Sequence, residues 1–150
     1  NTSGFRLSTQ NKILTALPAG EFEFLKPHFE LVDFSPGEIV YQAGDTIRFV
    51  YFPNNGMISL LSVTEQGQTV EIGFTGYEGL IGLPLLLEQS EMPYQALAQS
   101  QVECLRVEAK TAIQLFKQCG TFHDIVLRYF YVILKQISQT CICNHFHKIE

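Results

Sequence analysis

Between residues 39 and 107 the sequence alternates short apolar segments with turn residues, and this alternation limits the fold more than any other feature. Val, Ile, Phe, Leu and Tyr are concentrated in the segments 39–41, 49–52, 56–63, 68–74, 94–98 and 103–107. Gly, Asn, Asp and Pro lie between many of them. Turns that recur about every eight to twelve positions are typical of a β-sandwich or barrel. The sequence therefore predicts a mainly β fold with flanking helices.

Two helices are expected before these strands, within Ser8–Phe29. Apolar residues recur at helical spacing on both sides of Pro18. Because proline interrupts a helix, the pattern predicts two short helices, with Ser8 or Thr9 as the N-cap of the first. After the strands the period changes again, and Ala109–Phe116 is predicted to be another short helix.

A long helix is predicted from Phe122 to the end of the chain, after a Cys119-Gly120-Thr121 turn that ends the short helix and caps the long one. Apolar residues recur in it at steps of three or four, as in a coiled-coil seam. They are Phe122, Val126, Tyr129, Ile133, Ile137 and Cys141. One small barrel cannot cover so much apolar surface, so packing against a second copy is the simplest solution. We therefore expect a homodimer through residues 122–150.

The segment Gly76–Ala98 is the candidate ligand site. Its three glycines, at positions 76, 79 and 82, let the backbone turn tightly and approach another group closely. The apolar run Leu83–Leu87 then predicts a short buried helical turn, and Tyr94–Ala98 a returning strand. Together these parts form a small cradle in which a sensing domain could hold a ligand. Spacing alone favours a structural corner of the barrel over such a site.

The composition indicates one apolar globular domain. The chain has 150 residues, of which 46% are hydrophobic and 17% charged, so we expect part of its surface to be buried against a partner. A net charge of -5 argues against this segment clamping nucleic acid, which requires clustered Lys and Arg. Neither a membrane span nor a secretory leader stands out, so we expect a cytoplasmic protein with reduced cysteines and no membrane partner. Because the chain stops at Glu150 within a periodic pattern, we also expect a piece of a longer protein.

Three stretches occur in a characteristic order: FSPGEIVYQAGD at 34–45, VYFPNNGMIS at 50–59 and GQTVEIGFTGYEGLIG at 67–82. Together with the long helix, they resemble the effector domain of the Crp/Fnr family of bacterial transcription regulators. The resemblance implies a double-stranded β-helix (jelly roll) with N-terminal helices over residues 1–120. It further implies a dimerisation helix and the start of a hinge over 121–150, with a DNA-binding winged helix-turn-helix after Glu150. DNA, and RNA polymerase as a further candidate, would then be partners of the longer protein.

The resemblance also suggests which residues would face an effector. In family members that bind cyclic nucleotides, a Glu that follows a Gly takes the ribose hydroxyl, and an Arg on the next strand takes the cyclic phosphate. Here Gly82 is followed by Leu83, the Arg position falls at Tyr94 or Gln95, and no Lys or Arg lies between positions 48 and 106. Because charge-assisted contacts dominate phosphate binding, tight binding of cyclic AMP or cyclic GMP is not expected. The candidate pocket residues are Gly79, Gly82, Leu83, Tyr94, Gln95, Ala96 and Ser138, the last at the position that reads the purine.

Two other classes of protein stay open. A cyclic-nucleotide-binding-like module of another signalling protein, such as a kinase or a channel, would need the absent Glu and Arg. A jelly roll can also be a metal-dependent enzyme of the cupin type, which places its His ligands on strands. The four His residues of this chain, His28, His123, His145 and His147, all fall in predicted helices. We therefore expect no inward-facing ligand set and no catalytic residues.

Cys141, Cys143, His145 and His147 are the one group whose residue types suggest a metal. On a helix the pairs 141/145 and 143/147 point about 200° apart, so helix packing is preferred to a metal site. The iron–sulfur branch of the family uses an N-terminal group of cysteines, and no cysteine precedes Cys104. The sequence thus predicts no metal and no resident cofactor; an effector, if there is one, is unassigned.

Overall fold

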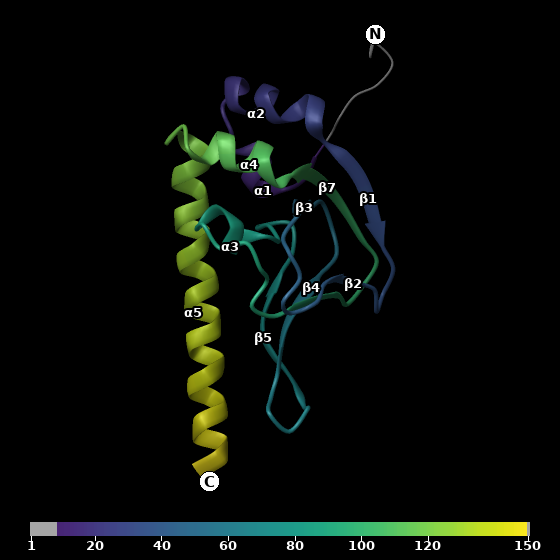
Figure 1. The fold of residues 1–150 in the computed structure, drawn as a ribbon, viewed down its shortest axis with the longest axis vertical. Coiled ribbons are helices and arrows are strands. Elements are labelled where there is room, and N and C mark those ends of the chain that lie inside the picture. The colour runs from purple at the N-terminus through teal and green to yellow at the C-terminus, as the bar shows by residue number, and fades with distance from the viewer. Residues whose placement is uncertain (1–8, 150) are drawn as a thin grey trace.

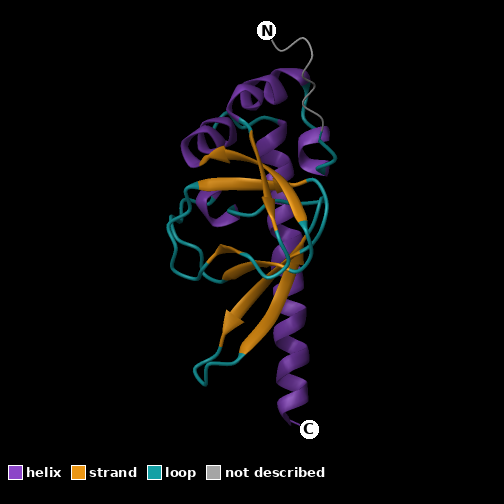
Figure 2. Ribbon diagram, turned by 90° about the vertical axis from the view of Figure 1, so that its right-hand side faces the viewer, coloured by secondary structure: helices purple, strands orange, loops and turns teal. Residues whose placement is uncertain are grey.

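The computed structural model describes residues 9–149, with side chains through Thr140, and shows two antiparallel sheets, short helices at one end and one long helix alongside (Figures 1 and 2). The predicted mainly β jelly roll with flanking helices is confirmed. In chain order the elements are α1 (Lys12–Thr15), α2 (Ala19–Leu25), η1 (Lys26–His28), β1 (Glu30–Phe34), β2 (Ile39–Tyr41), β3 (Phe49–Pro53), β4 (Ile58–Val63), β5 (Thr69–Thr75), α3 (Leu83–Leu86), β6 (Gln95–Ala98), β7 (Val102–Glu108), α4 (Ala109–Phe116) and α5 (Thr121–Ile149).

The strands divide between a sheet of order β1-β7-β3 and a sheet of order β2-β6-β4-β5. Strands that are neighbours in the sequence therefore often belong to different sheets, so the chain crosses between the two layers repeatedly. The core contains fully buried side chains from both sheets, among them Val50, Phe52, Ile58, Leu60 and Leu105. Burying one such side chain contributes about 1.5–3 kcal/mol to folding, so the two sheets hold together mainly through this apolar layer.

Helix α5 runs along the roll and packs against it from its start to about its middle (Figure 1). Near its start, the buried Phe122 ring lies 6.4 Å from the ring of Phe52. Further along, Gln136 Oε1 accepts a hydrogen bond of 3.0 Å from the backbone N–H of Phe74 in β5. This bond lies beside the register shift between β4 and β5 at Leu60/Leu61. The long helix is thus tied to the sheet through both apolar and polar contacts.

The N-terminus of α5 is capped by a side chain from α2. Glu21 accepts hydrogen bonds from the backbone N–H groups of Thr121 and Phe122, at 2.9 and 2.7 Å. A carboxylate at this end of a helix satisfies free amides and complements the helix dipole. The predicted turn between the two helices is therefore present, but the cap comes from about a hundred residues away rather than from Thr121.

Two local predictions need correction. Strand β1 was not expected, although Glu30–Phe34 pairs with β7 over its whole length. The N-cap of α1 is Asn11, whose Oδ1 accepts hydrogen bonds from the N–H groups of Ile13 and Leu14. Thr9 bonds instead to Asn54, at 2.6 Å between the hydroxyl and amide oxygens, and Ser8 lies outside the described residues.

None of the helices within residues 9–149 combines the length and the apolar character that a bilayer crossing needs. The division of the chain into a sensory part, 1–120, and a dimerisation part, 121–150, stays a prediction.

Candidate functional site

The turn, short helix and strand predicted for Gly76–Ala98 are present, and the cavity beside them, the cradle, is nearly filled. Its walls come from β4, β5, the turn before α3, the segment before β6, and α5. The lining residues are Leu60, Thr75, Leu80, Ile81, Gly82, Leu83, Met92, Tyr94, Tyr129 and Ile133. The cavity that they leave is about 10 Å³, roughly the space of one water molecule. A nucleotide cannot enter without displacing part of this wall.

Tyr129 of α5 closes the cradle. Its hydroxyl lies 2.6 Å from Oγ1 of Thr75, and the ring packs against the Cα of Gly79, where a Cβ would overlap it. Burial raises the pKa of Tyr129, and this outweighs the opposing effects of the hydrogen bonds from Thr75 and the Leu80 backbone. The phenol therefore stays neutral, and Gly79 is required because only glycine leaves room for the ring.

The turn that carries Gly79 also accepts hydrogen bonds from Asn11 and Lys12, at the start of α1. Asn11, which is completely buried, donates hydrogen bonds from Nδ2 to the carbonyl oxygens of Pro53 and Gly79, at 2.8 and 2.9 Å. The backbone N–H of Lys12 donates to the carbonyl of Tyr77 at 2.7 Å. Helix α1, with its N-cap Asn11, and helix α5, through Tyr129, thus both contact this turn, so its conformation depends on both.

Gly82 shapes the next part of the wall. Its φ is +110°, a left-handed conformation, and a Cβ would lie 3.1 Å from the carbonyl oxygen of Phe49. This turn starts α3 and directs Leu83, which is 5% exposed, into the cradle. The position to which the resemblance assigns a ribose-binding carboxylate is thus a buried leucine.

Among the predicted pocket residues, the structure brings Gly82, Leu83 and Tyr94 together in the lining and sets Gly79 against Tyr129. It does not place Gln95, Ala96 or Ser138 there. Gln95 donates to the side-chain oxygen of Gln42 at 2.8 Å, Ala96 is buried within β6, and Ser138 is exposed on α5. Leu60, Thr75 and Met92 also line the cradle. Sequence reasoning did not single them out as pocket residues, although Thr75 lies in the 67–82 stretch and Met92 in the Gly76–Ala98 segment.

The lining contains no charged side chain among its described residues. Arg106, the first cation after Arg48 in the sequence, is engaged elsewhere: its Nε lies 2.9 Å from the Glu30 carboxylate, and its guanidinium stacks 3.8 Å from the centroid of the Phe49 ring. Burial raises the pKa of Tyr94, so this phenol is neutral too. The cradle therefore offers no positive charge to a phosphate. A phosphate ligand would lose the charge-assisted hydrogen bonds that normally provide much of its binding energy.

The apolar stripe that was predicted to form the dimer seam packs inside its own chain. Four of its members, Phe122, Val126, Tyr129 and Ile133, are buried against the roll, and Ile137 is half-buried against the same core. These side chains are not free to meet a second copy. The side chain of Cys141 lies outside the described residues, so its assignment stays a prediction.

A second apolar stripe on α5 faces solvent. Leu127, Phe130, Tyr131 and Leu134 are between 37% and 63% exposed. At about 100° per residue, they lie on a face roughly a quarter to a third of a turn away from the buried stripe. Sequence reasoning missed this stripe because the two share the same spacing.

Among the described residues, no group of three or more His, Cys, Asp and Glu side chains comes together. The group that the sequence singled out, Cys141, Cys143, His145 and His147, lies outside the described side chains and stays untested. Burial raises the pKa of Cys104 to about 12, so its thiol is not ionised at neutral pH.

Residues 31–119, more than half of the chain, match the family model described as "Cyclic nucleotide-binding domain". The chain belongs to this family. No curated protein sequence matches it. Eight of the ten residues that line the cradle lie within the matched range.

Solved structures with the same fold include two transcription regulators and a regulatory subunit of a protein kinase. The Thermus thermophilus catabolite activator protein superposes with a TM-score of 0.70 at 18% identity, over 89% of this chain and 63% of that chain. The regulatory subunit of a cAMP-independent protein kinase A from Trypanosoma brucei, in a mutant form bound to cAMP, superposes with a TM-score of 0.68 at 17% identity. The match covers 80% of this chain and 43% of that chain. The c-di-GMP-responsive global regulator CLP of Xanthomonas campestris superposes with a TM-score of 0.60 at 20% identity, over 83% of this chain and 60% of that chain. This chain spans less than two thirds of the length of each.

Proposed function

We propose that this chain is the effector-sensing and dimerisation portion of a Crp/Fnr-type transcription regulator, that it acts in the cytoplasm, and that it has no catalytic activity. It does not bind cyclic AMP tightly; any effector is a small molecule of another kind. The DNA-binding helix-turn-helix follows Glu150 in the longer protein, and DNA and RNA polymerase are partners of that longer protein.

The main support for this proposal is that α5 has two apolar faces, one buried and one exposed. One face of the helix is buried against the roll and supplies Tyr129 to the cradle, while a neighbouring face exposes four large apolar side chains. Large apolar residues that recur at steps of three and four on an exposed helix face favour pairing with a second helix of the same kind. A second copy of the chain supplies such a helix.

This arrangement provides a route for a signal. The turn at Gly76–Gly82 touches α5 through Tyr129, and α5 leads toward Glu150. A change in the packing of that turn shifts the population of α5 positions, and a paired α5 then reorients whatever follows it. The effector and the DNA-binding part must bias the same helix for this to work.

Replacing Leu134 with glutamate is expected to abolish dimer formation. Leu134 is 48% exposed and lies on the outer stripe, so the substitution leaves the core of the chain intact. A dimer would bury this carboxylate against apolar side chains, which should raise the dimer dissociation constant about a hundredfold. Sedimentation velocity at micromolar concentration should give twice the 17.0 kDa chain mass for the original chain and a single chain mass for the variant.

The matched control is Val132→Glu. Val132 is 45% exposed, two residues away on the same helix, but on a different face from the outer stripe. This variant should remain a dimer. The proposal fails if the original chain sediments as a monomer, or if Leu134→Glu leaves the mass unchanged. A kinase or channel sequence after Glu150, in place of a helix-turn-helix, would favour the other signalling classes.

A further inference from the structure

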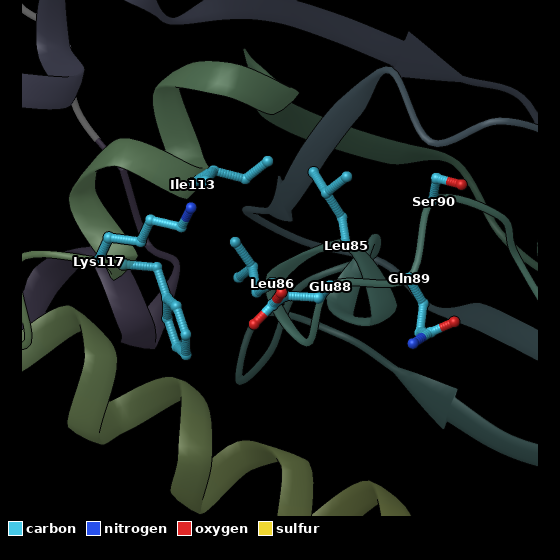
Figure 3. A pocket seen from close by; sticks show the side chains of 8 residues that line it. Leu85, Leu86, Glu88, Gln89, Ser90, Ile113 and Lys117 are labelled. Atoms are coloured by element: carbon cyan, nitrogen blue, oxygen red, sulfur yellow. The ribbon is translucent and has the colours of Figure 1, made fainter.

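A second pocket lies between α3 and α4, outside the cradle (Figure 3). Its volume is about 210 Å³, and it shares no lining residue with the cradle. Its apolar wall is formed by Leu85, Leu86, Ile113 and Phe116. An apolar cavity of roughly 150 Å³ is enough to hold a benzene ring, so this pocket has room for a branched or aromatic side chain and the polar group that carries it.

Two groups of opposite charge lie at the mouth of the pocket. In Figure 3 the ammonium end of Lys117 and the carboxylate of Glu88 point into the same hollow from opposite sides. Neither takes part in an ion pair among the side chains that the structure describes. The pocket therefore offers one positive and one negative group to a ligand.

Glu88 follows the C-cap of α3 directly, and its φ is +67°. A left-handed residue at this point is a common way for a helix to end, and a hydrogen bond of 2.9 Å from the N–H of Gln89 to the carbonyl of Pro84 closes the turn. The exposed side chain of Glu88 lines the pocket from this turn.

We propose that this pocket binds a small zwitterion with an apolar side chain, of the class of the branched and aromatic α-amino acids. The ammonium group of the ligand pairs with Glu88, its carboxylate pairs with Lys117, and its side chain packs on the apolar wall. A simple carboxylic acid would leave Glu88 without a partner, and a simple amine would leave Lys117 without one. Charge complementarity therefore selects the zwitterion.

The position of the pocket links it to the rest of the chain. Helix α3 directly follows Gly82 of the cradle, and α4 leads through the turn at Cys119–Gly120 into α5. A ligand that bridges α3 and α4 would fix the distance between these two segments. Binding itself does not depend on the proposed regulatory function, whereas any effect on the dimer rests on it.

The test is calorimetric titration of the 150-residue chain with L-leucine and L-phenylalanine, compared with isopentylamine and with the oxo acid that corresponds to leucine. At least one amino acid should bind with a dissociation constant of about 1 mM or below. Each analogue lacks one of the two charges and should bind about tenfold more weakly or not at all. Glu88→Gln and Lys117→Ala should each weaken amino-acid binding by about the same factor.

The matched controls are Glu91→Gln and Lys110→Ala. Both are exposed charged residues near the pocket, in the segment after α3 and in α4, and neither lines it. They should bind the amino acid as the original chain does. Absence of saturable heat with both amino acids, equal binding of a singly charged analogue, or unchanged binding by Glu88→Gln and Lys117→Ala would each overturn the assignment. Sedimentation of the same samples reports dimer formation separately, so the two proposals can fail independently.

Discussion

Gly79→Ala is expected to lower the free energy of unfolding by about 3 kcal/mol, because its Cβ would overlap the buried ring of Tyr129. The ring has little freedom to move, since its hydroxyl is held by Thr75 and the residue is only 6% exposed. The backbone at Gly79 is not in the left-handed region, so the cost is one of overlap rather than of backbone strain. Urea unfolding followed by circular dichroism measures the change.

Gly20→Ala is the matched control for this substitution. Gly20 lies in α2 with nothing within 4 Å of its Cβ position, so alanine there should be neutral or stabilising by up to about 1 kcal/mol. The double variant Gly79→Ala with Tyr129→Leu should lose less stability than the sum of the two single losses, because the leucine no longer reaches the new methyl group. Strict additivity would mean that Tyr129 does not fill the cradle.

Asn11→Ala is expected to cost about 3–4 kcal/mol, because it removes four hydrogen bonds of a completely buried side chain. Two of these cap α1, and the other two hold the carbonyl oxygens of Pro53 and Gly79. Alanine removes the Nδ2 donor from both carbonyls at a position that is completely buried. The same urea unfolding experiment gives the loss.

Gln10→Ala is the control for Asn11→Ala. Gln10 is exposed, and in the described contacts only its backbone N–H is used, as a donor to Asn54. Its side chain should therefore contribute less than about 0.5 kcal/mol. A loss below about 1 kcal/mol for Asn11→Ala would show that α1 does not hold the turn at Gly79.

Much of the β-roll could be predicted because its strands are separated by strong turn residues. The strands near 49–52, 68–74 and 103–107 lie where the sequence places them, within one or two residues. Strand β1 was missed because ELVDF follows a helix directly, with no Gly or Asn to mark the change, and because it has only five residues. Its partner, β7, lies about seventy residues further along the chain, so the pairing is invisible locally.

The long helix was predicted correctly, but the role of its apolar stripe was not. Three- and four-residue spacing shows that a helix has an apolar face, and it does not show whether strands or another helix cover it. Here the roll covers Val126 and Ile133, while Leu127 and Leu134, one residue further along in each case, are exposed. The choice between the two stripes depends on contacts across some fifty residues, such as that of Tyr129 with Thr75.

The candidate site could also be predicted only in part, because it too depends on contacts between distant residues. The absence of Lys and Arg between positions 48 and 106 could be read directly, and it already argued against a phosphate ligand. The small volume of the cavity could not be predicted from the sequence. The phenol that fills the cavity, that of Tyr129, comes from α5 rather than from the Gly76–Ala98 segment. The charge of the site could thus be predicted from its residue types, whereas its volume depends on how distant segments pack together.

The central claim is that Tyr129 of α5 fills the cradle, so that this chain does not bind cyclic AMP tightly. Calorimetric titration of the 150-residue chain with cyclic AMP tests this most directly. We predict no saturable heat up to about 1 mM, because Tyr129 occupies the cradle and no cation lines it. A dissociation constant in the low micromolar range would contradict the account, since the nucleotide would then have displaced Tyr129 and found its phosphate partner elsewhere.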